Sequence, residues 1–148
     1  PFESGDYVTI HAESTPHIQK TLAEIRRRGA KAGLALNPAT PLDYCRWMLP
    51  DIDLLLVMTI NPGFAGQKLV PQTLDKIRCA KELLERAGST ALIETDGNVS
   101  FINAEKMRRA GTNIFVAGTS SLYTKEGTLE ENYRKLRCAI AQGEEHTK

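Results

Sequence analysis

The nearly continuous apolar run at residues 54–60 restricts the fold of this chain more than any other stretch. An apolar run of this length, bounded by turn residues, is typical of a strand that is buried on both faces, as in a parallel sheet. Residues 61–67 follow it, with Asn-Pro to end the strand and with Gly63 and Gly66 to expose backbone N–H groups. In α/β proteins, ligands bind to loops at the carboxyl ends of parallel strands. The sequence therefore predicts a buried strand that carries a ligand-binding loop.

Segments rich in β-formers alternate with helical segments along the chain. Strands are predicted at residues 7–11, 32–36, 54–60, 91–95 and 113–117. Helices are predicted at residues 15–29, 40–48, 71–88, 100–111 and from 128 toward 143. This alternation predicts an α/β fold with a parallel sheet and right-handed crossovers. An open doubly wound sheet and a part of an eight-unit barrel both fit the pattern, and a complete barrel needs about 200 residues or more.

The composition indicates a globular chain with no strong electrostatic field. Of 148 residues, 41% are hydrophobic and 25% are charged, and the net charge is +1. These values predict a single domain over residues 1–148 and no nucleic-acid or membrane partner. Three widely spaced cysteines argue against a disulfide framework and favour a reducing, cytoplasmic location. Because the chain opens at Pro1 without an initiator Met, we expect it to be incomplete at its amino end.

Three glycine-containing loops follow predicted strands at equivalent positions. They are Gly63-Phe64-Ala65-Gly66, Asp96-Gly97-Asn98 and Gly118-Thr119-Ser120. Any one of them could be an ordinary turn. Because the carboxyl ends of parallel strands meet at one edge of the sheet, the three together predict a phosphate site built from backbone N–H groups and hydroxyls.

Asp96 stands at the point where a predicted strand passes into its loop. A carboxylate there reaches the ligand cleft and can serve as a general acid/base or as a metal ligand. The alternative is an Asp-Gly turn in which the carboxylate caps nearby backbone groups. His11 ends the first strand on the same side, and with Glu13 close by we expect it to support the site rather than to catalyse. Met58 is expected to pack in the core.

These residues resemble a known family. The segment Val57-Met58-Thr59-Ile60-Asn61-Pro62-Gly63-Phe64-Ala65-Gly66-Gln67 resembles the signature of ribulose-phosphate 3-epimerases and of the related allulose-6-phosphate 3-epimerases. The segments that resemble the family's strands 4, 5, 7 and 8 are Thr9-Ile10-His11-Ala12-Glu13, Gly33-Leu34-Ala35-Leu36-Asn37-Pro38, Glu94-Thr95-Asp96-Gly97 and Val116-Ala117-Gly118-Thr119-Ser120.

The resemblance implies a (β/α)8 (TIM) barrel, of which this chain is the carboxyl-terminal portion with strands 4 to 8. It implies epimerisation at carbon 3 of a ketose phosphate by two acid/base groups and a divalent metal (zinc, iron(II) or manganese). Asp96 is then both a catalytic residue and a metal ligand. The residues implied to bind the sugar phosphate are Gly63, Phe64, Ala65, Gly66, Gly97, Asn98, Gly118, Thr119 and Ser120. A homo-oligomer is also expected.

The chain departs from the family pattern in two respects. The family's first three strands supply the second acid/base and the other metal ligands, and no segment here matches them, so we expect an incomplete metal site. The alternative to an epimerase is therefore an inactive fragment that keeps a phosphate-binding face. Asn98 stands where a second glycine is usual, and Ala65 where glycine is common, which favours the allulose-phosphate branch. Decarboxylation or aldol chemistry is a weaker option, against which the residues 62–64 argue.

Overall fold

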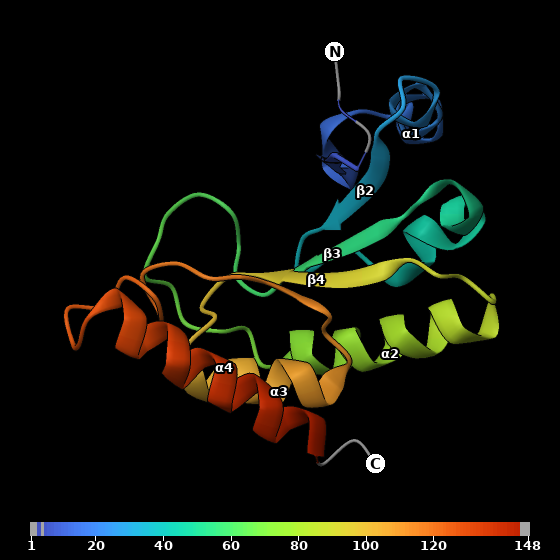
Figure 1. Cartoon of the computed structure of the whole chain (residues 1–148). Coiled ribbons are helices and arrows are strands. Elements are labelled where there is room, and N and C mark those ends of the chain that lie inside the picture. The colour runs from blue at the N-terminus through green and yellow to red at the C-terminus, as the bar shows by residue number, and fades with distance from the viewer. Residues whose placement is uncertain (1–2, 4, 146–148) are drawn as a thin grey trace.

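Five parallel strands form one sheet in the computed structural model, which describes residues 3 and 5–145. The strands are β1 (Tyr7–His11), β2 (Lys31–Leu36), β3 (Leu54–Met58), β4 (Leu92–Asp96) and β5 (Ile114–Val116). Each strand pairs in parallel with the next one in the sequence, so the order in the sheet is β1-β2-β3-β4-β5 (Figure 1). A doubly wound sheet instead reverses its strand order at a switch point.

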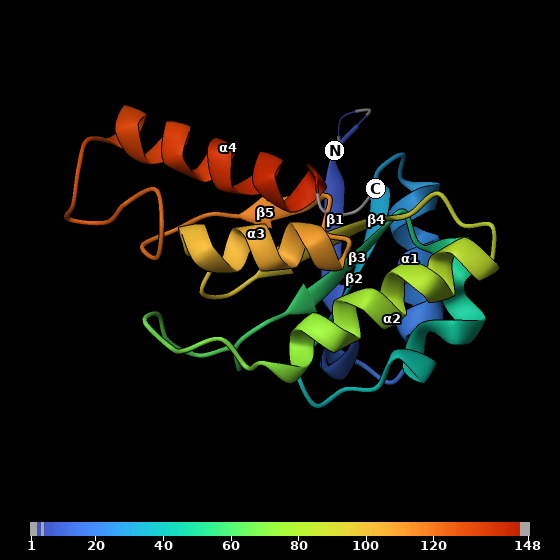
Figure 2. The same cartoon turned by 90° about the horizontal axis from the view of Figure 1, so that it is seen from below.

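The helices cover one face of this sheet. They are α1 (Ile18–Arg27), α2 (Gln72–Arg86), α3 (Phe101–Ala110) and α4 (Leu129–Glu145), with short 3-10 helices η1 (Ala12–Ser14) and η2 (Leu42–Asp51). In Figure 2, α2, α3 and α4 lie in front of the strands when the sheet is seen from below. One core cluster joins all four helices to the same side of the strands, through residues such as Leu22, Ile77, Met107 and Leu136. Helices on one face and an unbroken strand order identify the fold as part of a (β/α)8 barrel.

The two faces of β3 show how the strands divide their side chains. Leu55 and Val57 pack against the helices in the main core. Leu54, Leu56 and Met58 point to the opposite, concave face and form a second, small cluster with Ala35 and Ile114. All five residues of β3 are buried, which confirms the predicted buried strand and the core position of Met58. The strand ends two residues earlier than predicted because the chain bends at Thr59.

Two helix predictions are wrong in detail. The helix predicted to be capped by Thr15 begins instead at Ile18, because η1 follows β1 directly and the Thr15 hydroxyl accepts a hydrogen bond from the His17 N–H at 3.2 Å. The segment predicted as a helix after Thr40 is a 3-10 helix without a side-chain cap. It buries Cys45 and leaves Trp47 86% exposed.

The last two helices begin within one residue of their predicted starts. Ser100 accepts a hydrogen bond from the N–H of Asn103 at 3.3 Å, and Gly111 ends α3. Thr128 caps α4 by accepting from the N–H of Glu131 at 3.2 Å. Among the described residues, no helix is both long and apolar enough to cross a membrane.

The helix α4 continues past its predicted end at Gly143. This glycine allows a close approach between two helices, because a Cβ atom at position 143 would lie 2.5 Å from the carbonyl oxygen of Glu105 and 2.8 Å from Cβ of Arg108, both on α3. Residues 144–145 continue the helix, and residues 146–148 lie outside the described residues.

Candidate functional site

The carboxyl ends of the strands bring the three glycine loops together around a pocket of about 280 Å³. The predicted site residues that line it are Ala65, Gly66, Asp96, Gly97, Asn98, Gly118, Thr119 and Ser120. Gly63 and Phe64 do not line it, and the Phe64 side chain is 72% exposed on the outer part of its loop. Ile60, Val99 and Val116 supply apolar walls that the sequence had not indicated.

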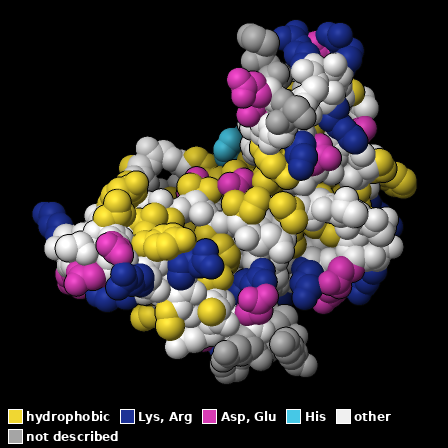
Figure 3. Space-filling view, in the orientation of Figure 1, with side chains coloured by type: hydrophobic (Ala, Val, Ile, Leu, Met, Phe, Trp, Pro, Cys, Tyr) yellow, Lys and Arg dark blue, Asp and Glu magenta, His cyan; other side chains and the backbone are white. Residues whose placement is uncertain are grey.

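Asp96 is the last residue of β4 and lies at the floor of this pocket. It pairs in register with Met58 on one side and with Val116 on the other, so its side chain points to the concave face. Figure 3 shows acidic and histidine side chains in the hollow on this side of the sheet, between hydrophobic ones. Burial raises the pKa of the Asp96 carboxyl, although the Gly97 N–H and the nearby His11 act in the opposite direction.

Glu94 is a second carboxylate on the same face, two residues before Asp96 on β4. Burial raises the pKa of Glu94, and the negative charge of Asp96 raises it further. Because burial disfavours the charged form of both carboxyls and the charge of Asp96 further disfavours that of Glu94, this face holds a proton more readily than an exposed carboxylate would.

Thr59 fixes the turn that carries Asp96. Its backbone N–H donates to the carbonyl oxygen of Asp96 at 2.8 Å, and its buried hydroxyl lies within hydrogen-bond reach of the carbonyl oxygens of Asp96 and Gly97. Gly97 has φ +114°, and a Cβ atom there would lie 2.9 Å from the backbone nitrogen of Ile60. Only glycine fits at this position, since both the backbone angle and the close approach exclude a side chain.

The loop after β5 forms part of the pocket lining. The N–H groups of Ser121 and Tyr123 both donate to the carbonyl oxygen of Gly118 at 3.2 Å, which folds this loop into a tight turn. Gly118, Thr119 and Ser120 line the pocket on the outside of that turn. A glycine and two hydroxyl residues in a pocket lining are residue types that can bind an anion such as a phosphate group.

His11 lies at the carboxyl end of β1, with its Nδ1 atom 3.5 Å from Oε2 of Glu13. Glu13 also accepts hydrogen bonds from the backbone N–H of Asn37 at 3.2 Å and from the hydroxyl of Thr40. Burial acts to raise the pKa of Glu13, but these hydrogen bonds outweigh it and lower the pKa. The arrangement agrees with the expected supporting role of His11, and it ties the loop after β2 to the end of β1.

The described residues do not fit a metal ion by themselves. They contain no group of three or more His, Cys, Asp or Glu side chains placed to hold one. Asp96 provides one carboxylate, whereas tight binding of a divalent cation such as zinc requires three or four protein ligands.

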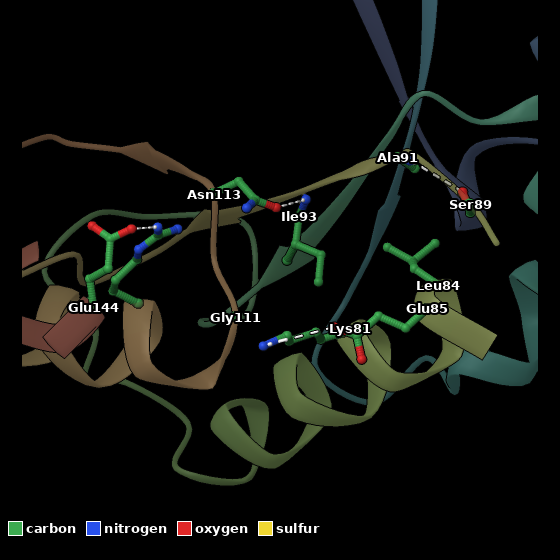
Figure 4. A pocket seen from close by; sticks show the side chains of 10 residues that line it. Lys81, Leu84, Glu85, Ser89, Ala91, Ile93, Gly111, Asn113 and Glu144 are labelled. Atoms are coloured by element: carbon green, nitrogen blue, oxygen red, sulfur yellow. Dashed lines mark hydrogen bonds and ion pairs between the residues drawn. The ribbon is translucent and has the colours of Figure 1, made fainter. Parts of the chain in front are cut away.

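A second pocket, of about 410 Å³, lies near the amino-terminal ends of β4 and β5 (Figure 4). Its charged side chains pair with one another: Arg108 with Glu144 at 2.7 Å and Lys81 with Glu85 at 3.9 Å. In (β/α)8 barrels, chemistry is found at the carboxyl ends of the strands. The pocket around Asp96 is therefore the candidate site.

Comparison with known sequences adds independent information. The profile of the ribulose-phosphate 3 epimerase family matches residues 2–122. The ribulose-phosphate 3-epimerase of Escherichia coli (strain K12) is 42% identical over 113 residues, which cover 76% of this chain and 50% of that protein. The Synechocystis ribulose-phosphate 3-epimerase is 42% identical over 118 residues, and that of Buchnera aphidicola subsp. Schizaphis graminum is 40% identical over 135 residues.

These matches cover 78% and 90% of this chain, and 51% and 59% of the two relatives. The chain thus spans about half the length of the curated relatives it matches. Among solved structures, 3-hexulose-6-phosphate synthase from Salmonella typhimurium superposes with a TM-score of 0.60 at 16% identity, over 93% of this chain and 63% of that one. This likeness concerns the fold alone.

Proposed function

The chain belongs to the ribulose-phosphate 3 epimerase family, and on this premise we propose that it acts in the epimerisation of a ketose phosphate at carbon 3. The observation that carries the proposal is the position of Asp96 at the floor of a pocket lined by the three glycine loops. The names of the relatives favour D-ribulose 5-phosphate, which would become D-xylulose 5-phosphate.

Asp96 is the acid/base group in this proposal. Its raised pKa brings the carboxyl closer to neutral pH, where a group exchanges protons with substrate more effectively. In one direction the carboxylate removes the proton from carbon 3, and in the other it returns a proton to the same face of the enediolate. Inversion also needs an acid or base on the opposite face of the sugar, and Asp96 cannot reach both faces.

The phosphate group of the substrate is proposed to bind between the loops after β4 and β5. Gly97, Asn98, Gly118, Thr119 and Ser120 surround this part of the pocket with backbone N–H groups and hydroxyls. Backbone donors at such positions bind phosphate without requiring a charged side chain. The loop that contains Gly63, Phe64, Ala65 and Gly66 forms the remaining wall with its last two residues.

A related substrate, allulose 6-phosphate, is the second candidate, with fructose 6-phosphate as its product. Ala65 and Asn98 favour it, because both replace glycines that are usual in ribulose-phosphate epimerases and both line the pocket. A divalent metal (zinc, iron(II) or manganese) with Asp96 among its ligands is part of the proposal. Because the described residues hold no group of three metal ligands, this chain by itself is proposed to bind the metal weakly and to be inactive.

The test joins this chain to the first three strand–helix units of a relative and measures exchange of the carbon 3 proton of ribulose 5-phosphate and of allulose 6-phosphate. We expect exchange with one of them, and loss of that exchange in Asp96→Asn. An active Asp96→Asn variant would contradict the assignment of Asp96, and exchange by the unjoined chain would contradict the inactive fragment. Size-exclusion chromatography of the purified protein tests the proposed homo-oligomer. Fractionation of cells tests the proposed cytoplasmic location.

A further inference from the structure

Asn98 is the only described residue other than glycine with a positive φ, at +46°. Asparagine adopts this left-handed conformation at lower cost than most residues, but glycine adopts it more readily still. The side chain at position 98 is therefore not required by the backbone. Its contacts, rather than the turn, must explain what it contributes.

The Asn98 side chain connects two loops of the pocket. Its Nδ2 atom donates to the carbonyl oxygen of Gln67 at 2.6 Å, across a sequence separation of 31 residues. Its Oδ1 atom accepts from Nδ2 of Asn103 on α3 at 2.7 Å, and the same Asn103 group lies 3.0 Å from the carbonyl oxygen of Asn98. The link thus joins the loop after β3, the loop after β4 and the first turn of α3.

The chemistry of the partners fixes the direction of this link. A backbone carbonyl only accepts hydrogen bonds, so Asn98 must present its NH2 group to Gln67. Its carbonyl oxygen then faces Asn103, which must donate. Each amide in the series therefore has one orientation that satisfies its neighbours.

Gln67 extends the link into the glycine loop. Its Nε2 atom donates to the carbonyl oxygen of Asn61 at 2.6 Å and to that of Phe64 at 3.0 Å. These two bonds fold residues 61–67 onto their own last residue. A hydrogen bond that restrains Gln67 therefore also restrains the rest of residues 61–67.

We propose that Asn98 is a positioning residue that ties the loop at residues 61–67 to the Asp96-Gly97 turn, so that two walls of the pocket keep a fixed relative position. The inference goes beyond the proposed function, because it rests on contacts within the chain and not on a substrate or a reaction. Without the tie, residues 61–67 lose their side-chain hydrogen bond to the loop after β4, and this wall of the pocket is held less firmly.

The experiment compares chymotrypsin cleavage after Phe64, which is 72% exposed, with cleavage after Trp47 and Tyr123 in the same molecules. Cleavage requires local opening of the chain, so its rate reports how often each segment is released. In Asn98→Gly, which keeps the turn and removes the tie, we expect cleavage after Phe64 to rise about fivefold to tenfold relative to the other two sites. Asn98→Asp keeps the size but loses the donor, and it is expected to behave in the same way.

Asn113→Ala is the matched control, because Oδ1 of Asn113 accepts from the N–H of Ile93 at 2.9 Å at the far end of β4. It removes a hydrogen bond of similar kind without touching the pocket, so the ratio of cleavage rates should not change. An unchanged ratio in both Asn98 variants would overturn the proposal, and so would an equal rise at all three sites, which indicates general destabilisation. Neither result bears on Asp96, whose role is tested by proton exchange.

Discussion

Glu94 and Asp96 lie on the same face of β4, one pleat apart, and burial raises the pKa of both. A carboxyl whose pKa is higher in the folded than in the unfolded chain stabilises the fold at low pH, and this stability is lost as the pH rises through the folded pKa. We therefore expect Glu94→Gln to be more stable than the parent chain at about pH 7.5 and to differ less from it at about pH 4. Urea unfolding at several pH values measures this difference.

Glu82→Gln is the control for this pH dependence, since Glu82 is an exposed carboxylate that pairs with Arg86 at 3.2 Å. Its removal takes away one carboxylate charge without changing the concave face. If stability depended on pH in the same way in Glu94→Gln and in Glu82→Gln, burial on the concave face would not disfavour the charged form of Glu94.

The two glycines Gly97 and Gly66 should respond differently to substitution by alanine. Gly97→Ala combines a positive φ with a close approach to the Ile60 backbone, and we expect it to destabilise the fold by about 3 kcal/mol or more. Gly66→Ala has a positive φ but nothing within 4 Å of the added Cβ, so a cost of about 1 kcal/mol is expected. Chemical unfolding of both variants gives the comparison, and equal costs would mean that the backbone angle alone decides.

The hydroxyl of Thr59 should contribute measurably to stability. Thr59→Val keeps the shape of the side chain but leaves the carbonyl oxygens of Asp96 and Gly97 without this donor, at an expected cost of about 1 to 3 kcal/mol. Thr59→Ser keeps the hydroxyl and should lose less. A Thr59→Val variant as stable as the parent would show that the hydrogen bonds of the hydroxyl do not contribute.

Gly143→Ala sets two effects against each other. Alanine favours a helix over glycine by about 1 kcal/mol, whereas the clash with Glu105 and Arg108 on α3 should cost about 1 to 3 kcal/mol. We expect the clash to dominate, with a lower urea midpoint and faster hydrogen exchange at the carboxyl end of α4. A higher midpoint would contradict the close contact between α3 and α4.

The strands were predicted well because each is a short apolar or β-branched segment bounded by turn residues. The end of β3 was misplaced because Thr59 has a good propensity for strands, while the bend at that point depends on the Asp96 and Gly97 carbonyls, nearly forty residues away. The start of α1 was misplaced for a local reason, because η1 absorbs the residues between β1 and the helix. The starts of α3 and α4 were predicted closely, because the hydroxyls of Ser100 and Thr128 each cap the helix that follows.

The residues of the candidate site were mostly predicted, but the hydrogen bonds between its loops were not. Glycine loops after strands indicated the pocket, and most of the predicted residues line it. Gly63 and Phe64 do not, because the loop turns outward before it returns at Ala65. The contacts of Gln67 and Asn103 were not predicted, because the sequence does not indicate which distant residue an amide side chain will bind. Sequence periodicity also could not tell on which face of the sheet the helices lie, and so it left two architectures open.

Consecutive side chains of β4 face two different environments, the helices on one side and the hollow on the other. Ile93 and Thr95 face the helices, where a change of volume disturbs the main core, whereas Glu94 and Asp96 face the hollow and carry little of the packing. The chemistry of Glu94 and Asp96 can therefore change at smaller cost to folding than that of Ile93 and Thr95, whereas Leu54, Leu56 and Met58 on the same side of the sheet form a packed cluster. A library randomised at Glu94 and Asp96 alone should therefore contain more folded proteins than one randomised at Ile93 and Thr95.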